Sequence, residues 1–288
     1  MDKQKHEFYL PNETSKLFAN YISDGDQLIF SVGFSERFVI YNQLQETDDW
    51  NDLFRKISSG NGNEKIVVFG RKSAGKSSLL RFMINSYKKM NCDSKLYYMD
   101  CDPGQTEFTP PGQISIVEIK DELYNLPCLN MLENKPLYSC SVGGIQTNNP
   151  NLYMTNVLSL IDFYQTELSN DKNMLFVNTM GWIRDLGLIL LCDIIKSINP
   201  THLIEIINEN ERETSQDDSF LQNIHQIESF LDQKPNHLLN YEFHKVNSSN
   251  KKRQLNKPKF NRTLIQLAYF SQIDGFDFKS INALTPFR

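Results

Sequence analysis

The residues with the clearest chemical meaning form the segment GRKSAGKS, which runs from Gly70 to Ser77. Its spacing fits the GxxxxGK[ST] pattern of a phosphate-binding loop (P-loop), whose backbone N–H groups curl around phosphate oxygens. In such a loop Lys76 reaches the β and γ phosphates of a nucleoside triphosphate, and the Ser77 hydroxyl is placed to ligate Mg²⁺. The residues expected to bind the nucleotide are Gly70, Arg71, Lys72, Ser73, Ala74, Gly75, Lys76, Ser77 and Ser78.

A pair of carboxylates follows in the segment YYMDCDPGQTEFTPPG, residues 97–112. P-loop enzymes use a carboxylate at the tip of a neighbouring strand to hold Mg²⁺ or to accept the proton of the attacking hydroxyl. We therefore expect Asp100 and Asp102 to be catalytic, with Asp100 joining Ser77 as a candidate metal ligand. Spacing alone does not decide which carboxylate has which task, and two loop aspartates that cap a turn are the alternative.

A tryptophan lies in a third cluster, VNTMGWIRDLG at residues 177–187, directly after the apolar run MLF. Trp182 either packs against the protein or stacks on a nucleobase, as aromatic side chains of single-strand binding proteins do. Arg184 is a candidate for contact with a phosphate backbone. The cluster therefore admits a nucleic acid as the second substrate.

A basic stretch at residues 244–262 holds seven Lys and Arg side chains and no acid. By itself it is as compatible with a solvated loop as with a mobile lid or a groove for a phosphate backbone. The nucleotide is expected to be ATP, because guanine-specific P-loop proteins usually carry an NKxD element. Here Asn256 and Lys257 are followed by Pro258 and Lys259, so the acid is missing.

The elements that must position these residues alternate between strands and helices. The β-rich run KIVVF precedes the P-loop, and the apolar spacing of residues 77–87 predicts a helix after it. This alternation predicts an α/β P-loop NTPase fold, with a mostly parallel sheet, flanking helices, and ligands at the carboxyl ends of the strands. Further strands are predicted at 95–100, 113–119, 174–178 and, last, 201–207, and helices at 152–164 and 186–198.

Residues 1–60 are expected to form a small N-terminal β appendage. The alternation of residues 27–41 indicates a hairpin or small sheet with Gly33 near its turn. Residues 47–57 then predict a short helix, capped by a threonine and apolar on one face. We therefore expect a β-rich segment with one helix, followed by a kinase domain over residues 61–288.

Bulk composition excludes several other classes of protein. The formal net charge of −5 and the pI near 5.6 exclude a polycation that coats nucleic acid, so any nucleic-acid contact must be local. Five cysteines lie scattered without a CxxC pair, the N-terminus is too polar for a signal peptide, and no apolar stretch is long enough to span a membrane. We expect a soluble intracellular protein with reduced thiols and no membrane contact.

Taken together, GRKSAGKSS, DCDPGQ, TPPG, NTMGWIRDLG, NPTH and LAYF make the chain resemble the polynucleotide 5′-hydroxyl kinases of eukaryotic RNA processing. That family has a nucleolar branch that acts on pre-ribosomal RNA and a branch within the pre-mRNA cleavage machinery. The resemblance covers about residues 47–280. The INPTH segment at 198–202 and the GGIQTNNPNLY segment at 143–153 are more similar to the nucleolar branch.

The resemblance implies a role for each matching residue. Lys76 and Ser77 would hold the triphosphate and Mg²⁺, while the two aspartates fall on the family's metal and base positions. Gln105 matches the glutamine of the DxDxGQ motif, and Trp182 matches the tryptophan that stacks on a base of the acceptor strand. Arg262 matches the lid arginine that approaches the transferred phosphate, which favours the lid interpretation of the basic stretch.

Two departures from the family pattern stand out. Where the family is expected to have Lys-Gly, this chain has Arg184 and Asp185, and an acid near a site for an anionic strand is expected to weaken RNA binding. The chain is also shorter than the usual members of the nucleolar branch. It is therefore expected to hold a short β appendage and the kinase core, with reduced substrate docking or partner binding.

The sequence thus predicts a Mg²⁺- and ATP-dependent kinase that phosphorylates the 5′-hydroxyl of RNA, or of DNA. The alternatives are an ATP-binding scaffold of an RNA-processing complex with low turnover, and a P-loop kinase for a nucleoside or another small hydroxyl substrate. The resemblance to the nucleolar branch implies an endonuclease partner that generates the 5′-hydroxyl end, and a location in the nucleus or nucleolus.

Overall fold

The computed structural model describes residues 5–9, 16–20, 22–24, 27–29, 47–60, 62–90, 94–170, 172–207, 240–249 and 258–270. The chain divides into two compact units. One comprises residues 46–251, and the other combines residues 1–45 with residues 252–288.

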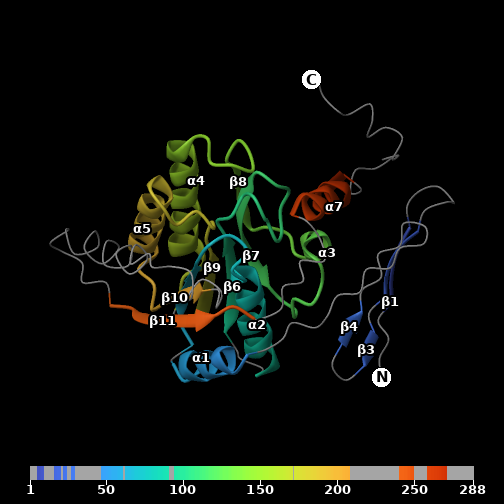
Figure 1. The fold of residues 1–288 in the computed structure, drawn as a ribbon, viewed down its shortest axis with the longest axis horizontal. Helices are drawn as coiled ribbons and strands as arrows, with labels where there is room; N and C mark the ends of the chain where they lie inside the picture. Colours follow the sequence, from blue (N-terminus) through green and yellow to red (C-terminus); the bar gives the residue numbers. More distant parts are fainter. Residues whose placement is uncertain are drawn as a thin grey trace, which may run out of the picture. The chain divides into compact units, whose positions relative to one another are not determined.

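The larger unit is built on a seven-stranded sheet (Figure 1). Five strands run parallel, and the two at one edge are antiparallel to their neighbours. The parallel strands other than the edge strand at residues 242–247 are apolar along most of their length, as strands covered on both faces must be. The predicted α/β P-loop fold is therefore confirmed. The strand order is β11 (Glu242–Asn247), β10 (His202–Ile207), β5 (Lys65–Phe69), β9 (Asn173–Asn178), β6 (Lys95–Asp100), β7 (Gln113–Ile119) and β8 (Tyr138–Ser141).

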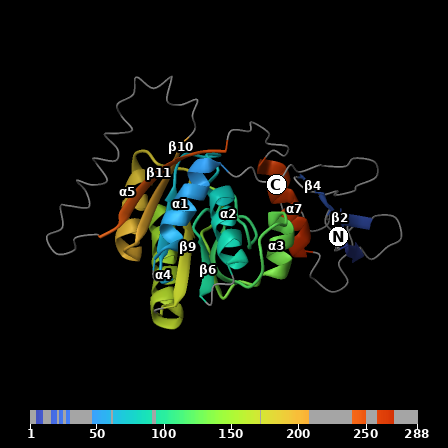
Figure 2. The same cartoon turned by 90° about the horizontal axis from the view of Figure 1, so that it is seen from below.

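Helices cover both faces of this sheet (Figures 1 and 2). Helices α1 and α2 lie on one face, and α4 and α5 lie on the other. The predicted helix at 186–198 has the bounds that the periodicity indicated. The helices described in this unit are α1 (Asp48–Ser58), α2 (Lys76–Lys89), α3 (Pro127–Glu133), α4 (Pro150–Phe163), which continues into the π-helical turn η1 (Tyr164–Leu168), and α5 (Leu186–Ile198).

The core on the α4 and α5 face follows from the alternation of the strands. Val67, Leu175 and Leu203 point to the same face of three adjacent strands and are buried there against helical residues such as Leu160 and Ile195. Burying each such side chain contributes about 1.5–3 kcal/mol. This packing holds the carboxyl ends of the strands in register, and those ends carry the candidate site.

Helix α1 belongs to the sheet unit, although the sequence placed it with the N-terminal segment. Trp50 is fully buried, and its indole Nε1 donates to the carbonyl of Asn247 at 2.9 Å. Its ring also packs against Phe82 of α2, with the ring centroids 5.7 Å apart. The apolar face of the helix needs a partner, and α2 and the edge strand β11 supply it. The compact units therefore divide the chain near residue 45 rather than at residue 60.

In the part of the smaller unit that the structure describes, there are two antiparallel strand pairs and one helix. Strand β1 (Lys5–Tyr9) pairs with β2 (Lys16–Asn20), and β3 (Ile22–Asp24) pairs with β4 (Gln27–Ile29). The N-terminal β character is thus confirmed, but residues 27–29 pair with the strand before them. Gly33 and the rest of the predicted hairpin lie outside the described residues. Helix α7 (Pro258–Phe270) completes this unit.

The basic stretch at 244–262 is not one continuous loop. It begins inside β11, which pairs parallel with β10, and it ends in the first turns of α7. The sequence predicted residues 201–207 as the last strand of the sheet, and this is wrong because β11 follows them. In β11, His244 and Val246 are buried on the face where α1 packs and alternate with exposed residues, as in a strand at a sheet edge. Residues 250–257 lie outside the described part of the chain.

Two further predictions concern membrane-spanning helices and the state of the cysteines. Among the helices that the structure describes, none is long and apolar enough to cross a membrane. Four of the cysteines are free thiols, namely Cys101, Cys128, Cys140 and Cys192. Cys92 lies outside the described residues.

Candidate active site

The P-loop connects β5 to α2, as the sequence predicted, and its glycines are required by geometry. Gly75 caps the helix with φ of 102°, and Gly70 has φ of 150°. A Cβ atom at Gly70 would lie 2.4 Å from the carbonyl oxygen of Ile206, so a side chain cannot be accommodated there. The loop therefore brings backbone N–H groups to the amino end of α2, where the helix dipole favours an anion.

Lys76 is buried at the start of α2. Its Nζ donates to the carbonyl oxygens of Gly70 at 3.1 Å and of Arg71 at 3.2 Å. Burial lowers the pKa of Lys76, while the nearby carboxylates of Asp102 and Asp100 oppose that change. The ammonium thus lies inside the loop with two acids close by, which is the arrangement of a P-loop lysine.

Asp100 ends β6 and is fully buried. Its Oδ1 accepts from the backbone N–H of Asp102 at 3.2 Å and from Asn178 Nδ2 at 3.0 Å, and its Oδ2 accepts from the backbone N–H of Glu107 at 2.8 Å. Burial and the charge of Asp102 raise the pKa of Asp100 to about 7, although the three donors oppose the rise. Asp100 is therefore held from several sides by the protein itself.

Asp102 lies two residues further on and is only half-buried. Its Oδ1 accepts from the backbone N–H of Gly104 at 3.0 Å, and its carbonyl accepts from that of Gln105 at 3.4 Å. Burial raises the pKa of Asp102, and the charge of Lys76 opposes this. The two aspartates thus differ in accessibility, and Asp102 is the one closer to solvent.

We expected the two aspartates on the strand beside the P-loop strand β5, but they do not lie there. Strand β9 lies between β5 and β6, so β6 is one strand further away. The end of β9 bridges the gap, because Asn178 donates to Asp100 while Thr179 Oγ1 donates to the carbonyl of Val68 on β5 at 2.9 Å. The sequence did not single out Asn178 or Thr179 as site residues, although Thr179 begins the TMGW motif and Asn178 directly precedes it.

The TMGW loop after β9 lies against the P-loop. A Cβ atom at Gly181 would lie 2.6 Å from both the N and the Cα of Lys72, so only glycine permits this approach. Trp182 follows at once, and 39% of its surface is exposed. Gly187 in turn leaves space for the indole, since a Cβ there would lie 2.4 Å from Trp182 Cγ. An exposed aromatic ring therefore lies one residue from the contact with the nucleotide loop.

Asp185, the departure noted in the sequence, has an uncommon backbone conformation. Its φ is 49° and its ψ is −126°, and it caps α5 without a side-chain hydrogen bond to the helix. Glycine adopts such angles without a steric penalty, whereas a side chain with a Cβ does not. The backbone geometry at this position thus agrees with the glycine that the family pattern has there.

Several predicted site residues have less defined surroundings. Ser73 has φ of 63°, Lys72 is exposed, and Gln105 is half-buried three residues after Asp102. Arg262 lies in the second turn of α7, which belongs to the smaller unit, so its approach to the P-loop stays a prediction.

A cluster of polar side chains holds the loop that follows β6 and contains Asp102. Glu107, whose N–H donates to Asp100, is buried and pairs with Arg81 of α2 and with the amide of Asn130 on α3. This cluster fixes the loop to two helices at once. The sequence did not predict it, because its members are spread over three separate segments.

The donor set also suits a magnesium ion. A hydroxyl at Ser77 and carboxylates at Asp100 and Asp102 are the hard oxygen ligands that Mg²⁺ prefers, and it usually binds through one or two carboxylates plus substrate phosphates. Both acids lie close enough to Lys76 to act on its pKa, and burial together with the charge of Asp102 raises the pKa of Asp100. The residues present therefore fit Mg²⁺ together with a triphosphate.

The chain is similar in sequence to several known proteins. The chain is 33% identical over 147 residues to the human polynucleotide 5′-hydroxyl-kinase NOL9, which is 51% of this chain and 20% of that protein. It is 34% identical over 152 residues to the Dictyostelium discoideum polynucleotide 5′-hydroxyl-kinase nol9, which is 52% of this chain and 22% of that protein. The chain thus matches about a fifth of the length of these relatives.

Among solved structures, the wild-type Clp1p–Pcf11p complex contains a chain with the same fold. It matches with a TM-score of 0.56 at 19% identity, over 76% of this chain and 52% of that chain. The sequence model of the family described as mRNA cleavage and polyadenylation factor CLP1 P-loop matches residues 70–246, from the first glycine of the P-loop to β11. Since this match spans more than half of the protein, the chain belongs to the CLP1 P-loop family.

Proposed function

We propose that the chain is an ATP-dependent kinase that transfers the γ-phosphoryl group to the 5′-hydroxyl end of a polynucleotide, RNA in the first place. The observation that carries this proposal is the contact between Gly181 and the backbone of Lys72. It fixes the loop that carries Trp182 beside the loop for the donor phosphates. A base stacked on Trp182 would hold the acceptor end close to the γ-phosphate.

The chain's own groups supply the positioning and charge that phosphoryl transfer needs. Lys76 would leave the loop carbonyls and neutralise phosphate oxygens, because an anion is a better partner for a buried ammonium than a carbonyl. Mg²⁺, held by Ser77 with Asp100 or Asp102, would neutralise charge on the β and γ oxygens. Arg262 would add a further positive charge at the transferred group.

Asp102 is the better candidate for the base that takes the proton of the 5′-hydroxyl. It is half-buried, whereas Asp100 is fully buried and already accepts three hydrogen bonds. A base must reach the hydroxyl within hydrogen-bond distance, which favours the more accessible carboxylate. Asp100 would then orient the loop and contribute negative charge toward the metal.

The relatives named polynucleotide 5′-hydroxyl-kinase NOL9 support this function, and their name also favours the nucleolar branch. On that basis we extend the proposal to pre-ribosomal RNA processing in the nucleolus. An endonuclease that leaves a 5′-hydroxyl end would supply the substrate.

A low-turnover ATP-binding scaffold is a second candidate, and one observation favours it. Asp185 keeps an acid and a strained backbone three residues after Trp182, on the side where an anionic strand would bind. Tight ATP binding without transfer to an oligonucleotide would support this second function.

The test is transfer of labelled γ-phosphate from ATP to a 5′-hydroxyl oligoribonucleotide. Wild type should transfer the label, and Lys76→Ala should lose about 10³-fold in rate, because the charge on the transferred group is then uncompensated. Lys89→Ala is the matched control, since it removes an exposed lysine from the last turn of the same helix.

A 5′-phosphorylated oligonucleotide should accept no label, and a nucleoside should compete poorly. No transfer by the wild type to any oligonucleotide would overturn the kinase proposal. Preference for the nucleoside would instead support a small-substrate kinase.

A further inference from the structure

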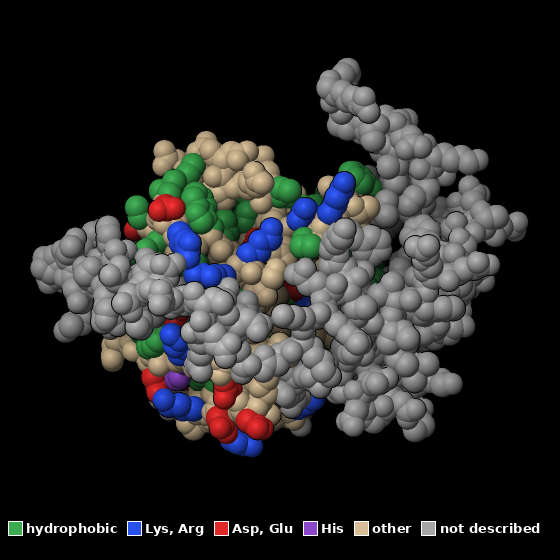
Figure 3. All heavy atoms as spheres, viewed as in Figure 1, with side chains coloured by type: hydrophobic (Ala, Val, Ile, Leu, Met, Phe, Trp, Pro, Cys, Tyr) green, Lys and Arg blue, Asp and Glu red, His purple; other side chains and the backbone are tan. Residues whose placement is uncertain are grey.

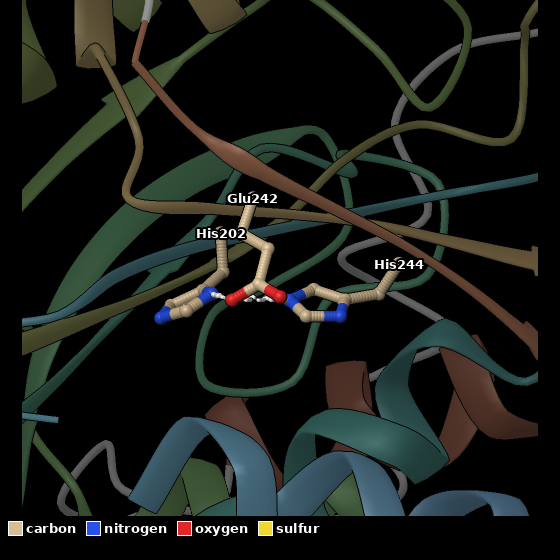
Figure 4. Close-up of side chains that lie close together, drawn as sticks. All are labelled: His202, Glu242 and His244. Atoms are coloured by element: carbon tan, nitrogen blue, oxygen red, sulfur yellow. Dashed lines mark hydrogen bonds and ion pairs between the residues drawn. The ribbon is translucent and has the colours of Figure 1, made fainter. Parts of the chain in front are cut away.

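Two histidines and a glutamate gather at the opposite end of the sheet from the P-loop (Figure 4). His202 is the first residue of β10, and Glu242 and His244 belong to the first half of β11. The two strands are parallel and His202 is paired with Glu242 in register, so the three side chains meet at the amino ends of the strands. The nucleotide site lies at the carboxyl ends, and the function proposed above does not use these residues.

The three side chains converge on one point. His202 Nδ1 lies 3.0 Å from His244 Nε2, and Glu242 Oε2 lies 3.8 Å from the first nitrogen and 3.9 Å from the second. A point equidistant from these three atoms lies about 2.1 Å from each, which is the length of Zn–N and Zn–O bonds in proteins. Figure 4 shows the three side chains meeting, with the carboxylate of Glu242 beside the two facing ring nitrogens.

A second carboxylate orients His202. The other ring nitrogen of His202, Nε2, lies 3.3 Å from Glu64 Oε2. When Nε2 carries the proton and donates it to Glu64, the lone pair of Nδ1 points to the shared centre. Carboxylate–histidine pairs of this kind are the usual outer shell of a metal-bound histidine, since they fix both the tautomer and the orientation of the ring.

The surroundings are compatible with a cation. Both imidazoles are buried, whereas the Glu242 side chain is 44% exposed and leaves a path from solvent. Lys56 of α1 pairs with the other oxygen of Glu242, Oε1, so Oε2 faces the histidines. Figure 3 shows acidic and basic side chains together on one face of the molecule.

We propose that His202, Glu242 and His244 bind a divalent transition-metal ion, with Zn²⁺ as the ion that fits best. Two imidazoles and a carboxylate are common zinc ligands, and water would take a fourth position above the plane of the three ligand atoms. The ion would connect β11 to β10 at the edge of the sheet and would thereby stabilise the strand on which α1 packs. This site is separate from the Mg²⁺ site, because imidazole ligands select against Mg²⁺.

The experiment is calorimetric titration of the full chain with Zn²⁺ in a buffer free of chelators, with thermal unfolding followed in parallel. The wild type should bind one Zn²⁺ with these ligands, and its Tm should rise with Zn²⁺ concentration because the ion binds the folded state. His244→Gln should weaken Zn²⁺ binding by at least about 100-fold, and Glu64→Gln by about 10-fold, as expected for the loss of a ligand and of an outer-shell partner.

Asp52→Asn is the matched control, because it removes a carboxylate of α1 that pairs with Arg55 instead. Its Zn²⁺ affinity should equal that of the wild type. If His244→Gln fails to fold, Glu242→Gln replaces it, since that side chain is half exposed, and the same loss is expected. A wild type without stoichiometric Zn²⁺ binding, or a ligand variant with unchanged affinity, would overturn the proposal. So would an equal loss in the control, which would assign the binding to scattered surface groups.

Discussion

The strands on the two sides of β5 carry buried carboxylates with very different surroundings. On the β6 and β9 side, Asp100 accepts three hydrogen bonds, and the chain turns back over the P-loop at Gly181. On the β10 side, Glu205 is 0% exposed, yet neither of its oxygens has a hydrogen-bond partner among the described residues, and Lys245 Nζ of β11 lies 3.8 Å away. Burial raises the pKa of both carboxyls to about 7.

A raised pKa therefore does not identify a catalytic group by itself. Asp100 is built into a network with Asn178 and Glu107, and its charge acts on Lys76 of the P-loop, whereas Glu205 is paired with one lysine on the face covered by α5. We therefore assign chemistry to the first side and a structural role to the second. The predictions below test this division.

The largest effect is expected from Asp102→Asn, compared with Asp100→Asn. If Asp102 is the base, its amide variant should lose about 10²–10⁴-fold in kcat with unchanged stability. Asp100→Asn should instead destabilise the fold by about 1–3 kcal/mol, because its amide turns an N–H toward one of three donors. Oligonucleotide phosphorylation and urea unfolding measure the two effects. The opposite pattern would exchange the roles of the two aspartates.

The next effect concerns the contact between the two loops. Gly181→Ala would place a Cβ atom 2.6 Å from the backbone of Lys72, and backbone cannot move aside as a flexible side chain would. We expect about a 100-fold loss in kcat/KM for the oligonucleotide, because a displacement near 1 Å has effects of this size. Gly144→Ala is the control, since its Cβ would meet nothing closer than 3.9 Å. Equal activity of the two variants would show that transfer does not depend on the position of Trp182 beside the P-loop.

Much of the P-loop side could be predicted because its signals are local. The loop, the strand that ends at Asp100 and the helix at 186–198 each follow from a motif or from apolar periodicity within one segment. Such signals are carried by residues close together in the sequence, so they can be recognised without knowledge of the fold.

The remainder depends on contacts between distant segments. The insertion of β9 between β5 and β6 is a matter of strand order, which periodicity does not encode. Strand β11 was missed because its sequence, EFHKVN, reads as part of a basic stretch, and only the pairing with β10 makes it a strand. The pairing of Glu205 with Lys245 is a consequence of that same register and was equally hidden.

The third prediction tests the other side of β5 through the pH dependence of stability. The pKa of Glu205 is about 7 in the folded protein and 4.5 in an unperturbed chain, so the folded state binds the extra proton between these values. Its contribution to stability is therefore complete below the unfolded pKa and is lost as the pH rises through the folded pKa.

Glu205→Gln does not titrate, so its stability relative to wild type should rise by about 1–3 kcal/mol between about pH 5 and pH 8. Urea unfolding at the two pH values measures this difference, and Asp100 contributes equally to both proteins. Glu118→Gln is the control, since this half-buried side chain also lies 3.8 Å from a lysine. Transfer activity should be unchanged at the lower pH. If folded Glu205→Gln loses transfer activity, Glu205 on the β10 side of β5 also takes part in catalysis.

The smallest effect concerns Asp185, where strain and charge can be separated. At φ of 49° and ψ of −126°, Asp185→Gly should stabilise the protein by about 1 kcal/mol, because glycine relieves a strained conformation. Asp185→Asn keeps the Cβ and the strain but removes the negative charge, so its stability should not rise. Both variants should bind an oligonucleotide more tightly, and the difference from wild type should shrink at high salt. A gain in affinity for the glycine variant alone would show that backbone conformation, rather than charge, limits the acceptor side of the site.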